Sequence, residues 1–71
     1  MQRVLFHPTE LLNLTKLLRR FKRSQWNLLI IGYAEALYDS KLFADPEMVD
    51  DPASRQDFID RIGLAARSVI G

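Results

Sequence analysis

The sequence predicts a mainly all-α protein, in which a helical hairpin is followed by a C-terminal helix and two copies form a dimer. Apolar residues recur at spacings of three and four along most of the chain, which is the period of one helical face. Two Asp-Pro pairs in the second half mark helix starts. A chain of 71 residues with no Cys buries a small core and forms no disulfides, so a partner chain is the stabilising element that remains.

The first helix is expected over residues 9–21, after residues 2–6, which form either a short strand or a loose arm. Pro8 disfavours a helical conformation at His7 and suits the first position of a helix. The apolar residues then follow one stripe of a helix. They are Leu11, Leu12, Leu14, Leu17, Leu18 and Phe21.

The second helix is expected from Trp26 to about residues 41–43. Residues 22–25 interrupt the apolar stripe for a full turn, and Ser24 is a plausible N-cap for the helix that follows. The alternative is one unbroken helix over residues 9–42, because no proline intervenes. We favour the hairpin, since a helix of about 34 residues would be unusual in so small a chain.

The third helix is expected to open at Asp51-Pro52, whereas Asp45-Pro46 opens a single turn. Its apolar side carries Phe58, Ile59, Ile62, Ala65, Ala66, Val69 and Ile70. The three helices then make one small helical domain over residues 1–71. The longest unbroken apolar run is residues 28–31, too short to span a bilayer, and no secretory signal is visible, so we expect a cytoplasmic protein without a membrane partner.

The second helix is apolar almost all round, which indicates burial on most sides. Gly32 and Ala36 lie four apart on one face, and a glycine inside a helix suggests close approach by another backbone. That backbone belongs either to a second copy or to a neighbouring helix of the same chain. The first reading predicts a homodimer with a two-fold interface. Its residues would be Trp26, Leu29, Ile30, Gly32, Tyr33, Ala36 and Leu37.

Charges are sorted along the chain. Residues 1–26 carry six basic residues against one acid, a net +5, and residues 35–60 carry eight acids against two basic residues, a net −6. The basic cluster Arg19, Arg20, Lys22 and Arg23 exceeds what is needed to offset a helix dipole, and phosphate binding would account for the excess. Equally, the two halves could attract each other within or between subunits. Trp26, just beyond the cluster, could stack on a base or pack in the core or dimer.

Residues 2–40 also resemble the ribbon-helix-helix family of DNA-binding repressors. Residues 2–6 would be the strand that pairs across the dimer, residues 7–10 the entry to the first helix, and Arg23-Ser24 the entry to the second. The resemblance implies that Arg3 and His7 contact bases, and that the amides at Ser24 hold a phosphate. The sequence departs from the family in its poorly alternating strand and in lacking a glycine between the helices.

No constellation typical of a chemical site is found, so we expect neither an enzyme nor a cofactor. His7 is the only histidine, and no nucleophile-base pair, phosphate-binding glycine loop or zinc spacing is present. The acids at 45–51 lack the glycine and closing glutamate of a calcium loop. The favoured function is a small DNA-binding regulator, repressor-like, that uses Arg3, Arg19, Arg20, Lys22, Arg23 and Ser24. The alternative is an adaptor or inhibitor that binds another protein through apolar and acidic positions such as Tyr38, Phe43 and Asp50.

Overall fold

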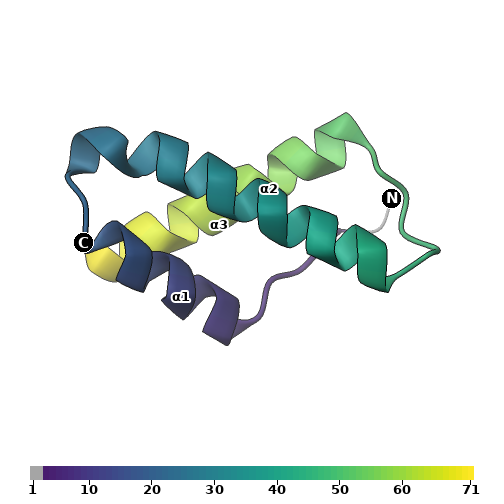
Figure 1. Ribbon diagram of the computed structural model, residues 1–71, viewed down its shortest axis with the longest axis horizontal. Coiled ribbons are helices and arrows are strands. Elements are labelled where there is room, and N and C mark those ends of the chain that lie inside the picture. Colours follow the sequence, from purple (N-terminus) through teal and green to yellow (C-terminus); the bar gives the residue numbers. More distant parts are fainter. Residues whose placement is uncertain (1–2) are drawn as a thin grey trace.

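The computed structural model describes residues 3–71, and these form three α-helices without any β-strand (Figure 1). The helices are α1 (Pro8–Leu18), α2 (Trp26–Ala44) and α3 (Pro52–Ile70), with a short 3-10 helix, η1 (Arg23–Gln25), before α2. The predicted all-helical class and the three helices are confirmed. The alternative of one long helix over residues 9–42 is wrong, because residues 19–25 reverse the chain.

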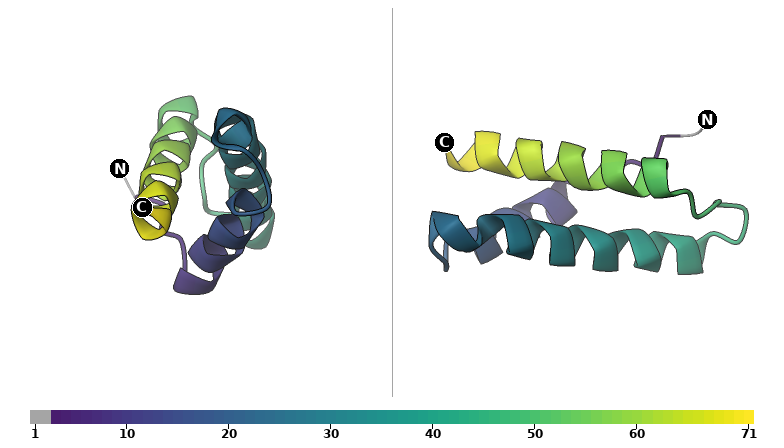
Figure 2. Two further views of the ribbon diagram at one scale, coloured as in Figure 1. Left: turned by 90° about the vertical axis from the view of Figure 1, so that its left-hand side faces the viewer. Right: turned by 90° about the horizontal axis from the view of Figure 1, so that it is seen from above.

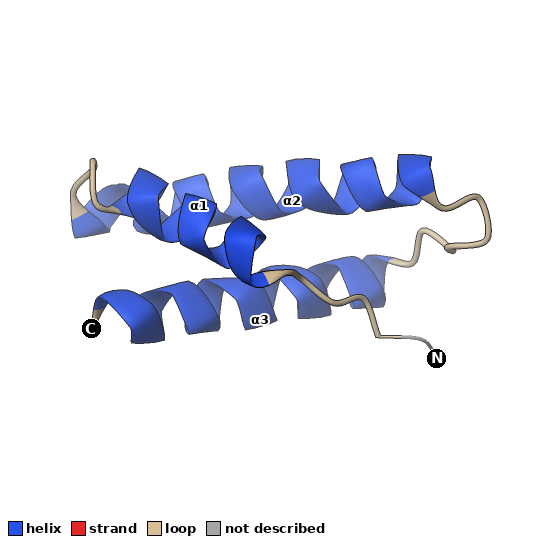
Figure 3. Ribbon diagram, turned by 90° about the horizontal axis from the view of Figure 1, so that it is seen from below, coloured by secondary structure: helices blue, strands red, loops and turns tan. Residues whose placement is uncertain are grey.

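α2 and α3 run antiparallel along the long axis of the molecule, and α1 packs across both (Figure 2). Seen from below, α1 crosses over the pair formed by the two longer helices (Figure 3). The described chain measures 37 × 21 × 17 Å along its principal axes. The core lies where the three helices meet. Its buried apolar residues are Leu14, Leu18, Trp26, Ile30, Ala34, Tyr38, Phe58, Ile59, Ile62 and Ala66.

Local sequence signals set the helix starts. Pro8 occupies the first turn of α1, and the Glu10 carboxylate accepts a hydrogen bond from the His7 amide at 2.7 Å. Asp51 caps α3, because its carboxylate accepts from the Ser54 amide at 3.0 Å. The single turn predicted at Asp45-Pro46 is also present, closed by a bond from the Met48 amide to the Asp45 carbonyl.

Two details differ from the predictions. α1 ends at Leu18, one turn before Phe21, and α2 extends to Ala44. The expected N-cap, Ser24, lies inside η1, while the N-cap position of α2 is Gln25 and makes no side-chain cap. The Gln25 side chain instead accepts from the Lys22 amide at 3.3 Å.

The N-terminal arm, residues 3–7, has no regular secondary structure and is attached to α3. The Arg61 guanidinium donates to the Val4 carbonyl, and the rings of Phe6 and Phe58 meet edge to face at 6.2 Å. Gln2, the first residue of the strand expected to pair across a dimer, lies outside the described residues. That strand stays a prediction.

Candidate nucleic-acid interface

The reversal between α1 and α2 depends on Trp26. Its indole Nε1 donates to the carbonyls of Leu18 at 3.0 Å and of Phe21 at 3.3 Å. In an uninterrupted helix these carbonyls would accept from amides four residues later. Here the Leu18 carbonyl accepts from the Phe21 amide, three residues later, as well as from the indole. Because the indole binds both carbonyls and its ring enters the core, with 4% of its surface exposed, the chain turns back at this point. The buried, hydrogen-bonded Trp26 side chain therefore holds in place the segment that carries the basic cluster.

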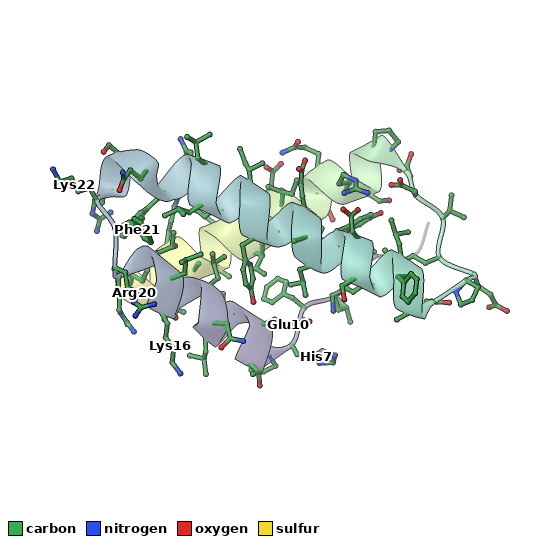
Figure 4. The ribbon with its side chains drawn as sticks, in the orientation of Figure 1. His7, Glu10, Lys16, Arg20, Phe21 and Lys22 are labelled. Carbon is green, nitrogen blue, oxygen red and sulfur yellow. The ribbon has the colours of Figure 1, made fainter. Side chains whose placement is uncertain are left out.

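The basic turn, defined as Arg19, Arg20, Lys22 and Arg23, projects from this reversal. All four residues are exposed, and Figure 4 shows Arg20 and Lys22 extending away from the end of the molecule. Arg19, Arg20 and Lys22 take part in none of the ion pairs found within residues 3–71. They lie at the C-terminal end of α1, where the helix dipole also favours positive charge. Three unpaired cations on one rigid turn suit a polyanion such as a nucleic-acid backbone.

Arg23 differs from its neighbours because it also has a structural role. Its guanidinium lies 4.6 Å from the centre of the Trp26 ring and donates to the carbonyl of Gly71 at 3.1 Å. Arg67, which the sequence did not single out, covers the same ring at 5.6 Å and donates to Asn27 at 2.6 Å. Trp26 is thus flanked by two cations, and its place is in the core of the single chain.

Two other residues proposed for DNA contact, Arg3 and Ser24, are placed differently. Ser24 belongs to η1 and is exposed beside the basic turn. Arg3 contacts Asp57 at 3.5 Å in the N-terminal half of α3. The basic turn lies beside the other end of that helix, through the contact of Arg23 with Gly71. Gly71 comes 14 positions after Asp57, just past the end of α3, so Arg3 and the basic turn lie about 20 Å apart along this helix.

Asp57 holds the N-terminal arm through two guanidinium groups. Its carboxylate accepts from Arg61 at 2.8 Å and from Arg3 at 3.5 Å. Both hydrogen bonds lower the pKa of the Asp57 carboxyl, and the bond from Arg61 has the larger effect. Arg3 is therefore engaged within its own chain.

The seven positions proposed for self-association fall into two groups. Trp26 and Ile30 lie in the core of the single chain, and Leu29, Tyr33 and Leu37 are half-buried against it. Gly32 and Ala36 are exposed, and nothing lies within 4 Å of a Cβ built on Gly32. Packing against α1 or α3 thus does not explain Gly32. With the exposed Leu28 and Ile31, these two small residues form an outer strip on α2.

A search of the described residues finds no cluster of His, Cys, Asp or Glu able to hold a metal ion. Within the same residues, every helix is too short or too polar to cross a membrane. Comparison with family models, with curated proteins and with solved structures gives no match.

Proposed function

We propose that this chain is a small, non-enzymatic DNA-binding regulatory protein, repressor-like and cytoplasmic, whose basic turn contacts the DNA backbone. The observation that supports it most directly is the set of exposed, unpaired cations Arg19, Arg20 and Lys22. Ion pairs within the chain neutralise other cations, among them Lys41 and Arg55. Phosphates would do the same for the basic turn, and the released counterions would supply the free energy.

The regulator acts as a homodimer in this proposal, because two basic turns bind one duplex more tightly than a single turn does. The outer strip of α2 supports self-association, with Leu28 78% exposed and Ile31 42% exposed around the open surface of Gly32. Replacing Gly32 by Leu would hold two helices apart. Light scattering should then report a smaller mass for Gly32→Leu than for the wild type at the same concentration, whereas equal masses would contradict this interface.

DNA binding is tested with a triple variant, Arg19→Gln, Arg20→Gln and Lys22→Gln. Arg23 is kept because it packs on Trp26. Binding of a labelled duplex, followed by fluorescence anisotropy in about 50 mM salt, should be lost. At salt concentrations where binding remains measurable, the slope of log K against log salt should fall by about 5, since the dimer loses six phosphate contacts and each contributes about 0.9.

A charge-matched control separates local contacts from net charge. Thr9→Glu, Ser40→Glu and Ala53→Glu lower the net charge by the same three units at exposed positions outside the basic turn. This control should retain most of the affinity for the duplex. The proposal fails if the wild type does not shift any duplex at low salt, or if the control loses as much affinity as the triple variant.

A second function, an adaptor or inhibitor that binds another protein, is favoured by Phe43. This aromatic residue at the end of α2 is 93% exposed. Exposed aromatic residues are typical of protein interfaces. Phe43→Ser should abolish capture of the partner while the fold is unchanged. If Phe43→Ser captures the partner protein as well as the wild type does, Phe43 is not a contact residue and the adaptor proposal loses its support.

A further inference from the structure

Unpaired charges of opposite sign lie at opposite ends of the molecule. The basic turn lies at one end, where α1 gives way to α2, and the loop over residues 45–51 lies at the other (Figure 1). The carboxylates of Asp45, Glu47 and Asp51 belong to none of the ion pairs within residues 3–71. The molecule therefore has two charged ends, and attraction between two such molecules favours an end-to-end arrangement.

The acidic end contains a cavity of about 770 Å³. The N-terminal arm, the end of α2, the 45–51 loop and the start of α3 line it, and its apolar lining includes Val4, Leu5, Met48 and Val49. This volume lies within the range of ligand-binding clefts, roughly 300–1,000 Å³. An apolar group entering this cavity would pass the three unpaired carboxylates, which belong to its lining.

The cations that line the cavity are already neutralised. Lys41 is paired with Glu10 at 3.0 Å, and Arg3 is paired with Asp57 at 3.5 Å. The apolar lining and the unpaired carboxylates thus suit an occupant that carries an apolar group and positive charge.

The basic end presents an occupant of this kind. Phe21 lies between Arg20 and Lys22, within the basic turn, and 45% of its surface is exposed. Figure 4 shows Phe21 close to these two residues at the end of the molecule. An aromatic ring between guanidinium and ammonium groups matches a cavity lined by apolar residues and carboxylates in both polarity and charge.

We infer that the basic turn of one copy docks, through Phe21, into the acidic cavity of a second copy. The contact is head to tail, so each copy keeps one free end and the assembly grows beyond two chains unless it closes into a ring. This goes beyond the proposed function, because the two-fold pair formed by α2 alone stops at two chains. It also means that the same cations serve either a second copy or DNA at any one time.

The test uses two complementary variants of the full chain, each lacking one end of the contact. The basic-end variant carries Arg19→Gln, Arg20→Gln, Phe21→Ser and Lys22→Gln and keeps its cavity. The cavity variant carries Glu47→Gln and Val49→Arg, both at exposed positions of the 45–51 loop, and keeps its basic turn. A matched control, Glu35→Gln with Leu64→Arg, makes the same two types of change on other exposed surfaces.

The weight-average mass is measured by analytical ultracentrifugation in low salt and without DNA, and circular dichroism verifies that each variant is folded. The mass of the wild type and of the matched control should rise with concentration. Each end variant should associate at least about tenfold more weakly, as expected for loss of an aromatic anchor. An equimolar mixture of the two variants should exceed the mass of either alone, because one supplies the cavity and the other supplies the basic turn.

Three results would overturn the inference. They are a wild-type mass that does not change with concentration, a mixture that matches the average of its components, and a matched control that dissociates like the cavity variant. Because DNA is absent, none of these results bears on the DNA-binding proposal. Conversely, a wild type that assembles in this way but does not bind duplex would refute only the proposed function.

Discussion

Lys41 and Glu10 form an ion pair that joins the end of α2 to the start of α1. The Lys41 Nζ atom lies 3.0 Å and 3.1 Å from the two carboxylate oxygens of Glu10, and both side chains are about four-fifths buried. Glu10 also accepts from the His7 amide, and its backbone carbonyl accepts from the Tyr33 hydroxyl at 2.9 Å. One residue of α1 thus fixes its own helix start and two contacts with α2.

The Glu10 carboxylate should make stability dependent on pH. Burial acts to raise its pKa, but hydrogen bonds from the His7 amide and Lys41, with the Lys41 charge, outweigh burial and lower the pKa below its usual value. Because the pKa is lower in the folded state, the ionised carboxylate stabilises the protein at pH values above the unfolded-state pKa of about 4.3. This stabilisation is lost as the pH falls through the folded-state pKa.

The variant Glu10→Gln should therefore be less stable than the wild type by about 1 kcal/mol at pH 7 and nearly equal to it near pH 3. Urea denaturation at both pH values measures this difference. Glu35→Gln is the control, because Glu35 is exposed on α2 and belongs to none of the ion pairs within residues 3–71. A Glu10→Gln deficit that stays constant between pH 7 and pH 3 would contradict the proposed role of the charge.

The two helical glycines should respond in opposite ways to alanine. A Cβ on Gly63 would lie 2.9 Å from Cγ2 of the buried Ile30, whose β-branched side chain has little room to rotate. Overpacking of about 1–3 kcal/mol outweighs the gain in helix propensity of about 1 kcal/mol, so Gly63→Ala should lower stability. Gly32 faces open space, so Gly32→Ala should raise stability by up to about 1 kcal/mol.

Thermal unfolding by circular dichroism at low protein concentration measures both changes, each variant serving as the control for the other. Low concentration matters because a side chain on Gly32 would also weaken the proposed pairing of α2. If Gly63→Ala were the more stable of the two, the close contact between α2 and α3 would not be as tight as the structure indicates.

The order of the helices follows from the sequence, because period, proline and capping signals are local. Pro8 and Asp51 begin helices where expected, since each acts within one turn of the chain. The start of α2 at Trp26 was also predicted, but the end of α1 was less accurate, because the helix break depends on a contact made by the Trp26 indole with the carbonyls of Leu18 and Phe21. No pattern of neighbouring residues encodes that contact.

The candidate site was predictable in its charge but not in its arrangement. The basic turn is contiguous in sequence, so the prediction and the structure place its four residues together. Arg3 was grouped with them through its charge and the resemblance to ribbon-helix-helix repressors, although Asp57 holds it in the other half of the molecule. Similarly, close approach to a helix was inferred at Gly32, whereas within the single chain it occurs at Gly63. Spacing identifies a face of a helix, and only the fold decides what covers it.

Trp26→Phe should destabilise the reversal between α1 and α2. Phenylalanine keeps an aromatic ring in the core but removes the Nε1 donor, so the Phe21 carbonyl loses this bond and the Leu18 carbonyl keeps only the bond from the Phe21 amide. The contacts of Arg23 and Arg67 with the ring also weaken, because indole is the better cation-π partner. We expect a loss of about 1–3 kcal/mol in the free energy of unfolding, measured by urea denaturation with circular dichroism. Phe43→Leu, at a 93% exposed position, should stay within about 0.5 kcal/mol of the wild type.

The hydroxyl groups of the two tyrosines of α2 should contribute differently to the stability of the protein. Tyr33 donates to the Glu10 carbonyl at 2.9 Å, whereas the Tyr38 hydroxyl is buried without a hydrogen-bond partner among the described residues. Tyr33→Phe removes a bond and should cost about 1 kcal/mol. Tyr38→Phe removes an unsatisfied polar group and should leave stability unchanged or raise it by up to about 1 kcal/mol, since desolvating that group opposes folding.

Chemical denaturation of the two variants side by side tests the contrast, because each loses a single oxygen atom from the same helix. A loss at Tyr38 equal to that at Tyr33 would show that its hydroxyl is hydrogen-bonded in solution.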